Sequence, residues 1–277
     1  MLRSILVGID GSAYSAAAVE LGIRWAQHSD AVLVGLGIID APTICKPQPV
    51  PLGGSAYKVH HDATLLADAG HKVEQFLEDC AQRCAEAGVA CQILQDTGLP
   101  AEQILLEAQQ YDLIMLGQHT FFHLETQQQP DTTLDTVLKQ SPRPVVAVPA
   151  TLPAGRVVVV AYDGSLHAVR TLQMFQAIGL DDPREVHVVC VDAHKEKADL
   201  YVDRAVTFLQ GHNVVAQAHA LATSESPAHV LLQYVQQVQA GLLVMGSSGR
   251  STLREFFGGS VTRTMLRESP VPIFLYH

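Results

Sequence analysis

The sequence predicts an α/β fold of two tandem domains, each a five-stranded parallel sheet with helices on both faces. The chain has 277 residues and is 48% hydrophobic, which is enough for two cores of ordinary size. The same landmarks recur in the same order in both halves. Short Val-, Ile- and Leu-rich runs alternate with amphipathic segments, and runs that are apolar throughout are typical of parallel strands covered by helices.

The internal repeat is clearest at the first strand of each half. An apolar run ends in Asp-Gly-Ser at Asp10 and again at Asp163, and a helical pattern follows both. Two later strands end in matching glycines, Gly117 and Gly246, and the last strands match as "SPRPVVAV" and "SPVPIFLY". The spacing between matches shrinks along the chain, so the first half contains about 25 extra residues.

Most of the extra residues fall between Asp40 and Asp62. Four prolines and two glycines interrupt this stretch, which predicts a long surface loop over residues 41–61. A helical face follows, made of Leu66, Ala69, Val73, Phe76, Leu77, Cys80 and Cys84.

The halves join through "ATLPAGR", where Pro153 and Gly155 break the neighbouring strands. We therefore predict a first domain over residues 1–151 and a second over residues 154–277. The linker is too short to let them separate freely.

Composition excludes several classes of function. The 18 basic and 28 acidic residues give a net charge of −10, which argues against binding to nucleic acid or to an anionic membrane. No apolar run is long enough to span a bilayer, and the first run reaches Asp10 too early for a signal peptide. The five cysteines form no disulfide framework. We therefore expect a cytoplasmic location.

A glycine pattern near the C-terminus indicates a phosphate site. Gly246 follows an apolar strand, and Gly249 and the pair Gly259-Ser260 complete a Gly-x2-Gly-x9-Gly-Ser spacing. Glycines after a strand and at a helix start expose backbone N–H groups to an anion, and Ser260 could cap the helix and donate its hydroxyl. Such glycines can also simply form turns. The ligand edge of a parallel sheet also holds Asp163, which could accept hydrogen bonds from a ribose.

With these motifs, the repeated unit resembles a universal stress protein domain over nearly all of both halves. In that family the same glycine motif binds ATP, and the resemblance implies a Rossmann-like fold of the adenine nucleotide alpha hydrolase-like type. It also implies a ribose contact at Asp163. The remaining contacts implied for adenine, ribose and phosphates are Ala161, Cys190 or Val191, Met245, Gly246, Ser248, Gly249, Gly259, Ser260 and Val261.

Two positions depart from the family pattern. Family members often have His where Ser248 stands and Pro where Ala161 stands. Neither difference should abolish binding.

The first half has lost most of the glycine pattern. Thr120 replaces the second glycine, and Asp131 lies near the third, where a carboxylate would repel phosphate. We therefore expect a degenerate first site, although a loop rearranged around Thr132 and Thr133 could admit another ligand.

Several reactive side chains have simpler interpretations. Arg250 and Arg254 could pair with phosphates but are more simply solvated. Cys80 and Cys84, with Cys91 nearby, share an apolar helix face, which favours buried thiols over a zinc site. The remaining candidates, expected to be surface imidazoles, are His60 and His61 in the proline-rich loop and His119 and His123 in the degenerate phosphate loop.

The leading hypothesis is a stress-response protein that binds ATP, or ADP or AMP, with or without Mg²⁺, as a regulatory ligand in its second domain. Binding would alter association with an unidentified protein partner. A slow ATPase is an alternative, but no general base is evident. A phosphorylated receiver module is disfavoured, because this chain lacks the acidic pair and the late-strand lysine of such modules. A scaffold that binds no nucleotide remains an alternative. The last strands of the two halves are expected to pair within one chain, and a homodimer is an open alternative.

Overall fold

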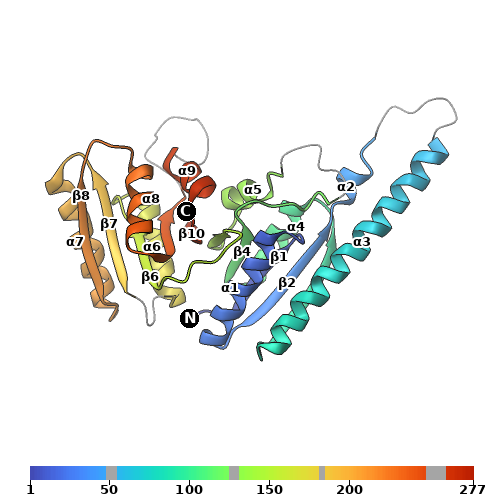
Figure 1. The fold of residues 1–277 in the computed structure, drawn as a ribbon, viewed down its shortest axis with the longest axis horizontal. Helices are drawn as coiled ribbons and strands as arrows, with labels where there is room; N and C mark the ends of the chain where they lie inside the picture. The colour runs from blue at the N-terminus through green and yellow to red at the C-terminus, as the bar shows by residue number, and fades with distance from the viewer. Residues whose placement is uncertain (48–54, 125–130, 181–184, 248–259) are drawn as a thin grey trace. The chain divides into compact units, whose positions relative to one another are not determined.

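The computed structural model describes residues 1–47, 55–124, 131–180, 185–247 and 260–277, and it has the predicted α/β architecture (Figure 1). Its contacts divide the chain into two units. One contains residues 3–143, and the other contains residues 144–277 together with Met1 and Leu2. Among the residues described, no helix has the length and apolar character needed to cross a membrane.

The first unit contains four parallel strands in the order β3-β2-β1-β4. The strands are β1 (Ser4–Ile9), β2 (Val32–Ile39), β3 (Cys91–Thr97) and β4 (Leu113–Gly117). The helices are α1 (Ala13–Ser29), α2 (Ala41–Ile44), α3 (Ser55–Glu86), α4 (Pro100–Glu107), the short 3-10 helix η1 (Ala108–Gln110) and α5 (Thr133–Gln140).

The second unit repeats this order as β8-β7-β6-β9 and adds β10 and β5 beyond β9. The strands are β5 (Val145–Val148), β6 (Val157–Ala161), β7 (Val186–Asp192), β8 (Ala216–Ala222), β9 (Ala240–Gly246) and β10 (Ile273–Tyr276). The helices are α6 (Leu166–Ile178), α7 (Lys195–Gly211), α8 (Pro227–Gln237) and α9 (Ser260–Glu268).

The last strand of the first repeat belongs to the second unit. In it, β5 pairs antiparallel with β10, with Phe274 opposite Val146, whereas β10 pairs parallel with β9. The pairing expected between the last strands of the two halves is therefore present, and it makes the sheet mixed. All three of Val146, Ala147 and Phe274 are fully buried.

Strand order decides which face each helix covers. The chain moves from β6 to β7 to β8 in one direction, so right-handed crossovers put α6 and α7 on one face. The later connections run the other way and put α8 and α9 on the opposite face. The helix contacts agree, because α6 packs against α7 and α8 against α9.

The Asp-Gly-Ser turns start the first helix of each repeat in the same way. The backbone N–H groups of Ser12 and Ser165 donate to the carboxylates of Asp10 and Asp163, each at 2.9 Å. The Ser12 and Ser165 hydroxyl oxygens then accept the N–H three residues later and cap α1 and α6. This local chemistry explains why the motif survives in both halves.

The prediction of a loop over residues 41–61 is wrong at both ends. Residues 41–44 form α2, capped by Asp40, and α3 already begins at Ser55. The first turns of α3 bury almost nothing, since Tyr57 and Val59 are exposed, so no apolar stripe marks them as helical. A Lys58–Asp62 ion pair, four residues apart, supports the helix there instead.

Farther along α3, the predicted apolar face is confirmed for five of its seven residues, while Leu66 and Phe76 are partly buried. Ala69, Val73, Leu77, Cys80 and Cys84 are all buried. This face packs mainly against β2 and β3.

Candidate functional site

A pocket of about 530 Å³ lies in the second unit at the carboxyl ends of β6, β7 and β9. Connections leave β6 and β9 toward opposite sides, and open α/β sheets bind ligands at such a switch point. The floor comes from strand ends, and the walls come from the starts of α6, α7, α8 and α9. The lining residues used below are Ala161, Asp163, Val191, Asp192, His194, Lys197, Thr223, Glu225, Met245, Gly246, Val261 and Thr262.

The turn after β6 brings Asp163 to the pocket. Gly164 has φ +71°, a left-handed conformation that favours glycine, and the ring of Tyr201 on α7 packs directly against it. A Cβ at Gly164 would lie 2.5 Å from that ring. The turn is thus held between α6 and α7, which fixes the position of the Asp163 carboxylate.

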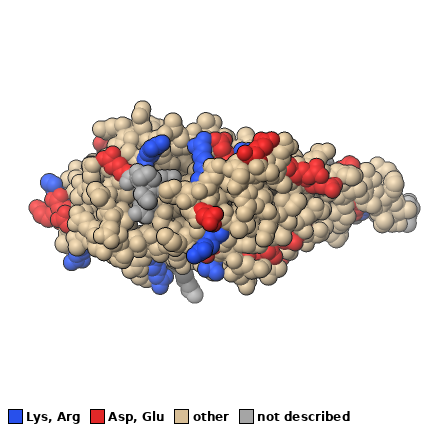
Figure 2. Space-filling model, turned by 90° about the horizontal axis from the view of Figure 1, so that it is seen from below, with Lys and Arg blue, Asp and Glu red and all other residues tan. Residues whose placement is uncertain are grey.

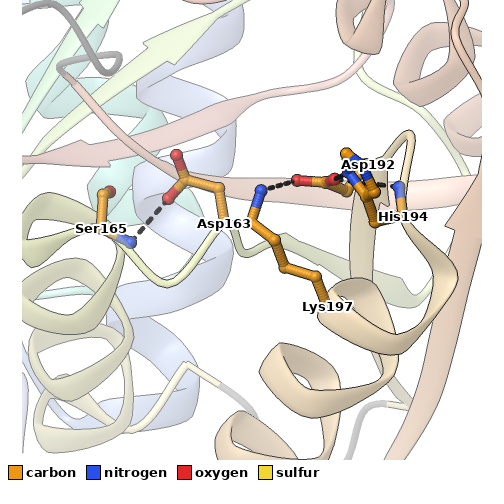
Figure 3. Close-up of polar contacts among 5 residues, drawn as sticks. All are labelled: Asp163, Ser165, Asp192, His194 and Lys197. Carbon is orange, nitrogen blue, oxygen red and sulfur yellow. Dashed lines mark hydrogen bonds and ion pairs between the residues drawn. The ribbon is translucent and has the colours of Figure 1, made fainter.

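A second carboxylate lies opposite, at the end of β7. Asp192 forms an ion pair with the Lys197 ammonium and accepts the backbone N–H of His194 at 3.1 Å (Figure 3). The Lys197 ammonium, helped by that N–H, lowers the pKa of Asp192 below its usual range. The figure shows Lys197 reaching from α7 into the space between Asp163 and Asp192. A cation therefore stands between two carboxylates at the pocket.

The floor beneath these groups is closely packed at Gly246. A Cβ at this position would lie 2.9 Å from the backbone of both His167 and Ala168 in α6. The glycine at the end of β9 therefore lets that strand approach the start of α6. On the far side, Val261 and Thr262 in the first turn of α9 complete the wall.

Most of the predicted site residues that the structure describes lie together. Around the pocket lie Ala161, Asp163, Val191, Met245, Gly246 and Val261. The Cys190 side chain is buried within the sheet and does not line it, and Ser260 is exposed at the first position of α9. The predicted contacts Ser248, Gly249 and Gly259, with Arg250 and Arg254, lie outside the described residues.

Sequence reasoning missed the polar wall on the side of β7 and β8. Asp192 and Lys197 come from the end of β7 and the start of α7, and Thr223 and Glu225 come from the connection between β8 and α8. One signal was available, since Asp192 ends the apolar run "VHVVCVD" at the same sheet edge as Asp163. Nothing in the sequence paired it with Lys197.

The corresponding crevice of the first half is filled by its own chain. The Asp10 carboxylate is only 4% exposed, and it accepts the backbone N–H of Phe121 at 2.7 Å. Phe122 is 2% exposed, and its ring lies against Gly8, which matches Ala161 in the repeat. An aromatic side chain thus occupies the position that corresponds to the pocket floor of the second unit.

Two further contacts hold this segment closed. Asp131 accepts the N–H groups of Phe122 and Thr133 at 2.7 and 2.8 Å. His123 lies 2.5 Å from the carboxylate of Asp40, so it is a paired group rather than the surface imidazole expected from sequence. We define residues 118–124 as the plug segment, since its contacts with Gly8, Asp10, Asp40 and Asp131 fill this crevice with protein.

The other histidine expectations also change in detail. His60 and His61 lie on α3 rather than in a loop, and His61 stacks with Tyr57. His119 is exposed and contacts the edge of Tyr14.

Charge is dispersed on the face drawn in Figure 2. Among the residues described there, Lys and Arg side chains lie singly or in small groups between acidic ones, without a broad basic area. This agrees with the net charge of −10 and gives no electrostatic footprint for nucleic acid on that face.

Comparisons with known proteins agree with the repeat. The model of the universal stress protein family matches residues 1–149 and again residues 155–277. A universal stress protein from Synechocystis is 22% identical over 288 residues, covering 99% of this chain and all of that protein.

Two solved structures share the fold over the whole chain. A universal stress protein from Archaeoglobus fulgidus superposes with a TM-score of 0.72 at 21% identity, over 98% of this chain and 97% of that one. A protein of unknown function from Pseudomonas aeruginosa gives a TM-score of 0.60 at 18% identity, over 99% and 92% of the two chains.

Proposed function

The chain belongs to the universal stress protein family, and from this premise we propose that it is a stress-response protein that binds ATP in the pocket of its second unit. The observation that carries the proposal is the convergence of Asp163, the end of β9 and the first turn of α9 on one pocket. A carboxylate suited to a ribose there faces a helix N-terminus suited to phosphate.

The apolar floor of the pocket supports a place for the adenine. Ala161, Val191 and Met245 line the pocket between the two helix layers, and the flat face of an aromatic base packs well against such a surface. The base would lie near Val191, the ribose near Asp163, and the phosphates near Gly246 and Val261. Lys197 would lessen the repulsion between the phosphates and Asp192.

Binding rather than turnover is the proposed activity. The pocket combines the ends of β6, β7 and β9 with the starts of α6, α7, α8 and α9, so one ligand would hold several parts of the unit together. A ligand that binds only this arrangement stabilises it by mass action. The nucleotide would thereby act as a regulatory ligand that changes the surface offered to a protein partner.

Calorimetric titration with ATP tests the proposal, with Asp163→Asn beside the wild type. We expect one site per chain, weakened at least about tenfold in the variant, because a hydrogen bond to a charged oxygen is lost. Asp10→Asn is the matched control from the first repeat, and it should leave binding unchanged. Titrations with ADP and with AMP under the same conditions, each with and without Mg²⁺, identify the preferred nucleotide.

Each other outcome favours a different function. No binding to the wild type would support a nucleotide-independent scaffold. Release of phosphate well above background, lost in Asp163→Asn, would support the slow ATPase. Weakening by Asp10→Asn instead would move the site to the first half.

A further inference from the structure

Three cysteines of the first unit converge on one point, although sequence alone favoured inert buried thiols. Cys80 and Cys84 lie four residues apart on α3, a spacing that puts both side chains on the same helix face. Cys91 opens β3, which follows α3 after a turn at Gly88 with φ +68°. All three Sγ atoms lie within 4.8 Å of one another.

From this geometry we propose that Cys80, Cys84 and Cys91 form a three-thiolate site for a zinc ion. Tetrahedral zinc binds thiolate at about 2.3 Å, which places its sulfur ligands about 3.8 Å apart. The three Sγ atoms therefore need to close by only about 1 Å. Within the described part of the chain, no other group of three potential ligands lies this close together.

The setting allows an open fourth position and an approach path. Cys80 and Cys84 are buried, whereas Cys91 is partly exposed on the edge strand of its unit. Cys80 also lines a crevice of about 120 Å³ together with Asp79 and Arg83. Three protein ligands and a water are the set found in catalytic zinc sites, whereas structural sites usually have four protein ligands.

Charge also favours a divalent ion. Three thiolates and Zn²⁺ leave one net negative charge. Burial raises the pKa of Cys84, and the nearby Arg83 cation opposes this effect in part. The thiols lose three protons as they bind the ion, and no oxidant or reductant is needed.

Bound zinc would link the C-terminal end of α3 to the start of β3. Both elements pack against β2, so the ion would stabilise the sheet edge of the first unit and would act independently of the nucleotide pocket.

The test is titration of the reduced, metal-free full chain with Zn²⁺ in competition with a chromogenic chelator. We expect one ion per chain with the wild type and at least about tenfold weaker binding with Cys91→Ser. Cys45→Ser is the matched control, because Cys45 is exposed and lies outside the cluster, and it should bind like the wild type. Circular dichroism checks that each variant is folded.

Titration with Cd²⁺ separates thiolate ligands from the chain's 13 histidines, since cadmium bound to thiolate gives an ultraviolet charge-transfer band. The proposal requires this band in the wild type and its reduction in both Cys91→Ser and Cys84→Ser. An absent band, or zinc affinity equal in the wild type and Cys91→Ser, overturns the site.

Discussion

At the residue scale, Gly246 is the position where the fold and the pocket depend on the same missing side chain. Gly246→Ala would push a methyl group to 2.9 Å from the backbone of His167 and Ala168. We expect the second unit to lose about 1–3 kcal/mol of stability and to bind ATP more weakly, because β9 and α6 must separate. Urea unfolding followed by circular dichroism measures the loss.

An internal control comes from Trp25, the single tryptophan, which is buried on α1 in the first unit. Its fluorescence transition should not move in Gly246→Ala. A variant as stable as the wild type would mean that the strand and helix are less tightly apposed than the geometry indicates.

Lys197 tests the electrostatics of the pocket. Lys197→Met removes the cation between Asp163 and Asp192 and leaves two carboxylates facing the phosphates. Because the pair is partly exposed, we expect a modest loss of ATP affinity, about two- to fivefold, that shrinks as salt is raised. Lys195→Met is the matched control, since Lys195 pairs with Asp199 on the same helix and does not line the pocket. Equal losses in the two variants would contradict the assignment.

The floor of the candidate site could be read from sequence better than its walls. Asp163, Met245 and Gly246 end apolar runs, so the rule that ligands bind at strand ends finds them. Lys197 lies within a helix among other charged residues, and only the packing of α7 beside β7 shows that it points to the pocket. Pocket walls made by helix starts depend on such packing.

At the element scale, the plug segment explains how the first half keeps its fold without the glycine pattern. Phe122→Ala would leave a cavity against Gly8 and Leu116, and we expect the first unit to lose about 3–5 kcal/mol. Trp25 fluorescence in urea reports the loss directly. The neighbouring Phe121 is 41% exposed, so Phe121→Ala should cost under about 1 kcal/mol and serves as the control.

The length of α3 shows where sequence periodicity stops being informative. Its buried stretch from Ala69 to Cys84 has a clear helical stripe, and the prediction there is confirmed. Its first turns cover no sheet, so they carry no stripe, and the nearby prolines favoured a loop. Periodicity detects burial, and an exposed helical extension is therefore missed.

At the scale of the whole molecule, β5 is the last strand of the first repeat but pairs within the second unit. The second unit therefore depends on the end of the first repeat. The family model matches residues 155–277 as one domain, yet a fragment of residues 154–277 lacks the strand that covers β10. Its β10 would expose an unpaired edge with Ile273, Phe274 and Leu275, and such edges pair readily with another copy. Two copies can pair antiparallel through β10, much as β5 does.

We therefore expect the 154–277 fragment to dimerise through β10, and a 144–277 fragment, in which β5 already covers β10, not to dimerise through this edge at the same concentration. Sedimentation velocity separates the two states. A monomeric shorter fragment with native circular dichroism would instead mean that β5 adds little to this unit, and that the boundary between the repeats is also the boundary between independently stable domains.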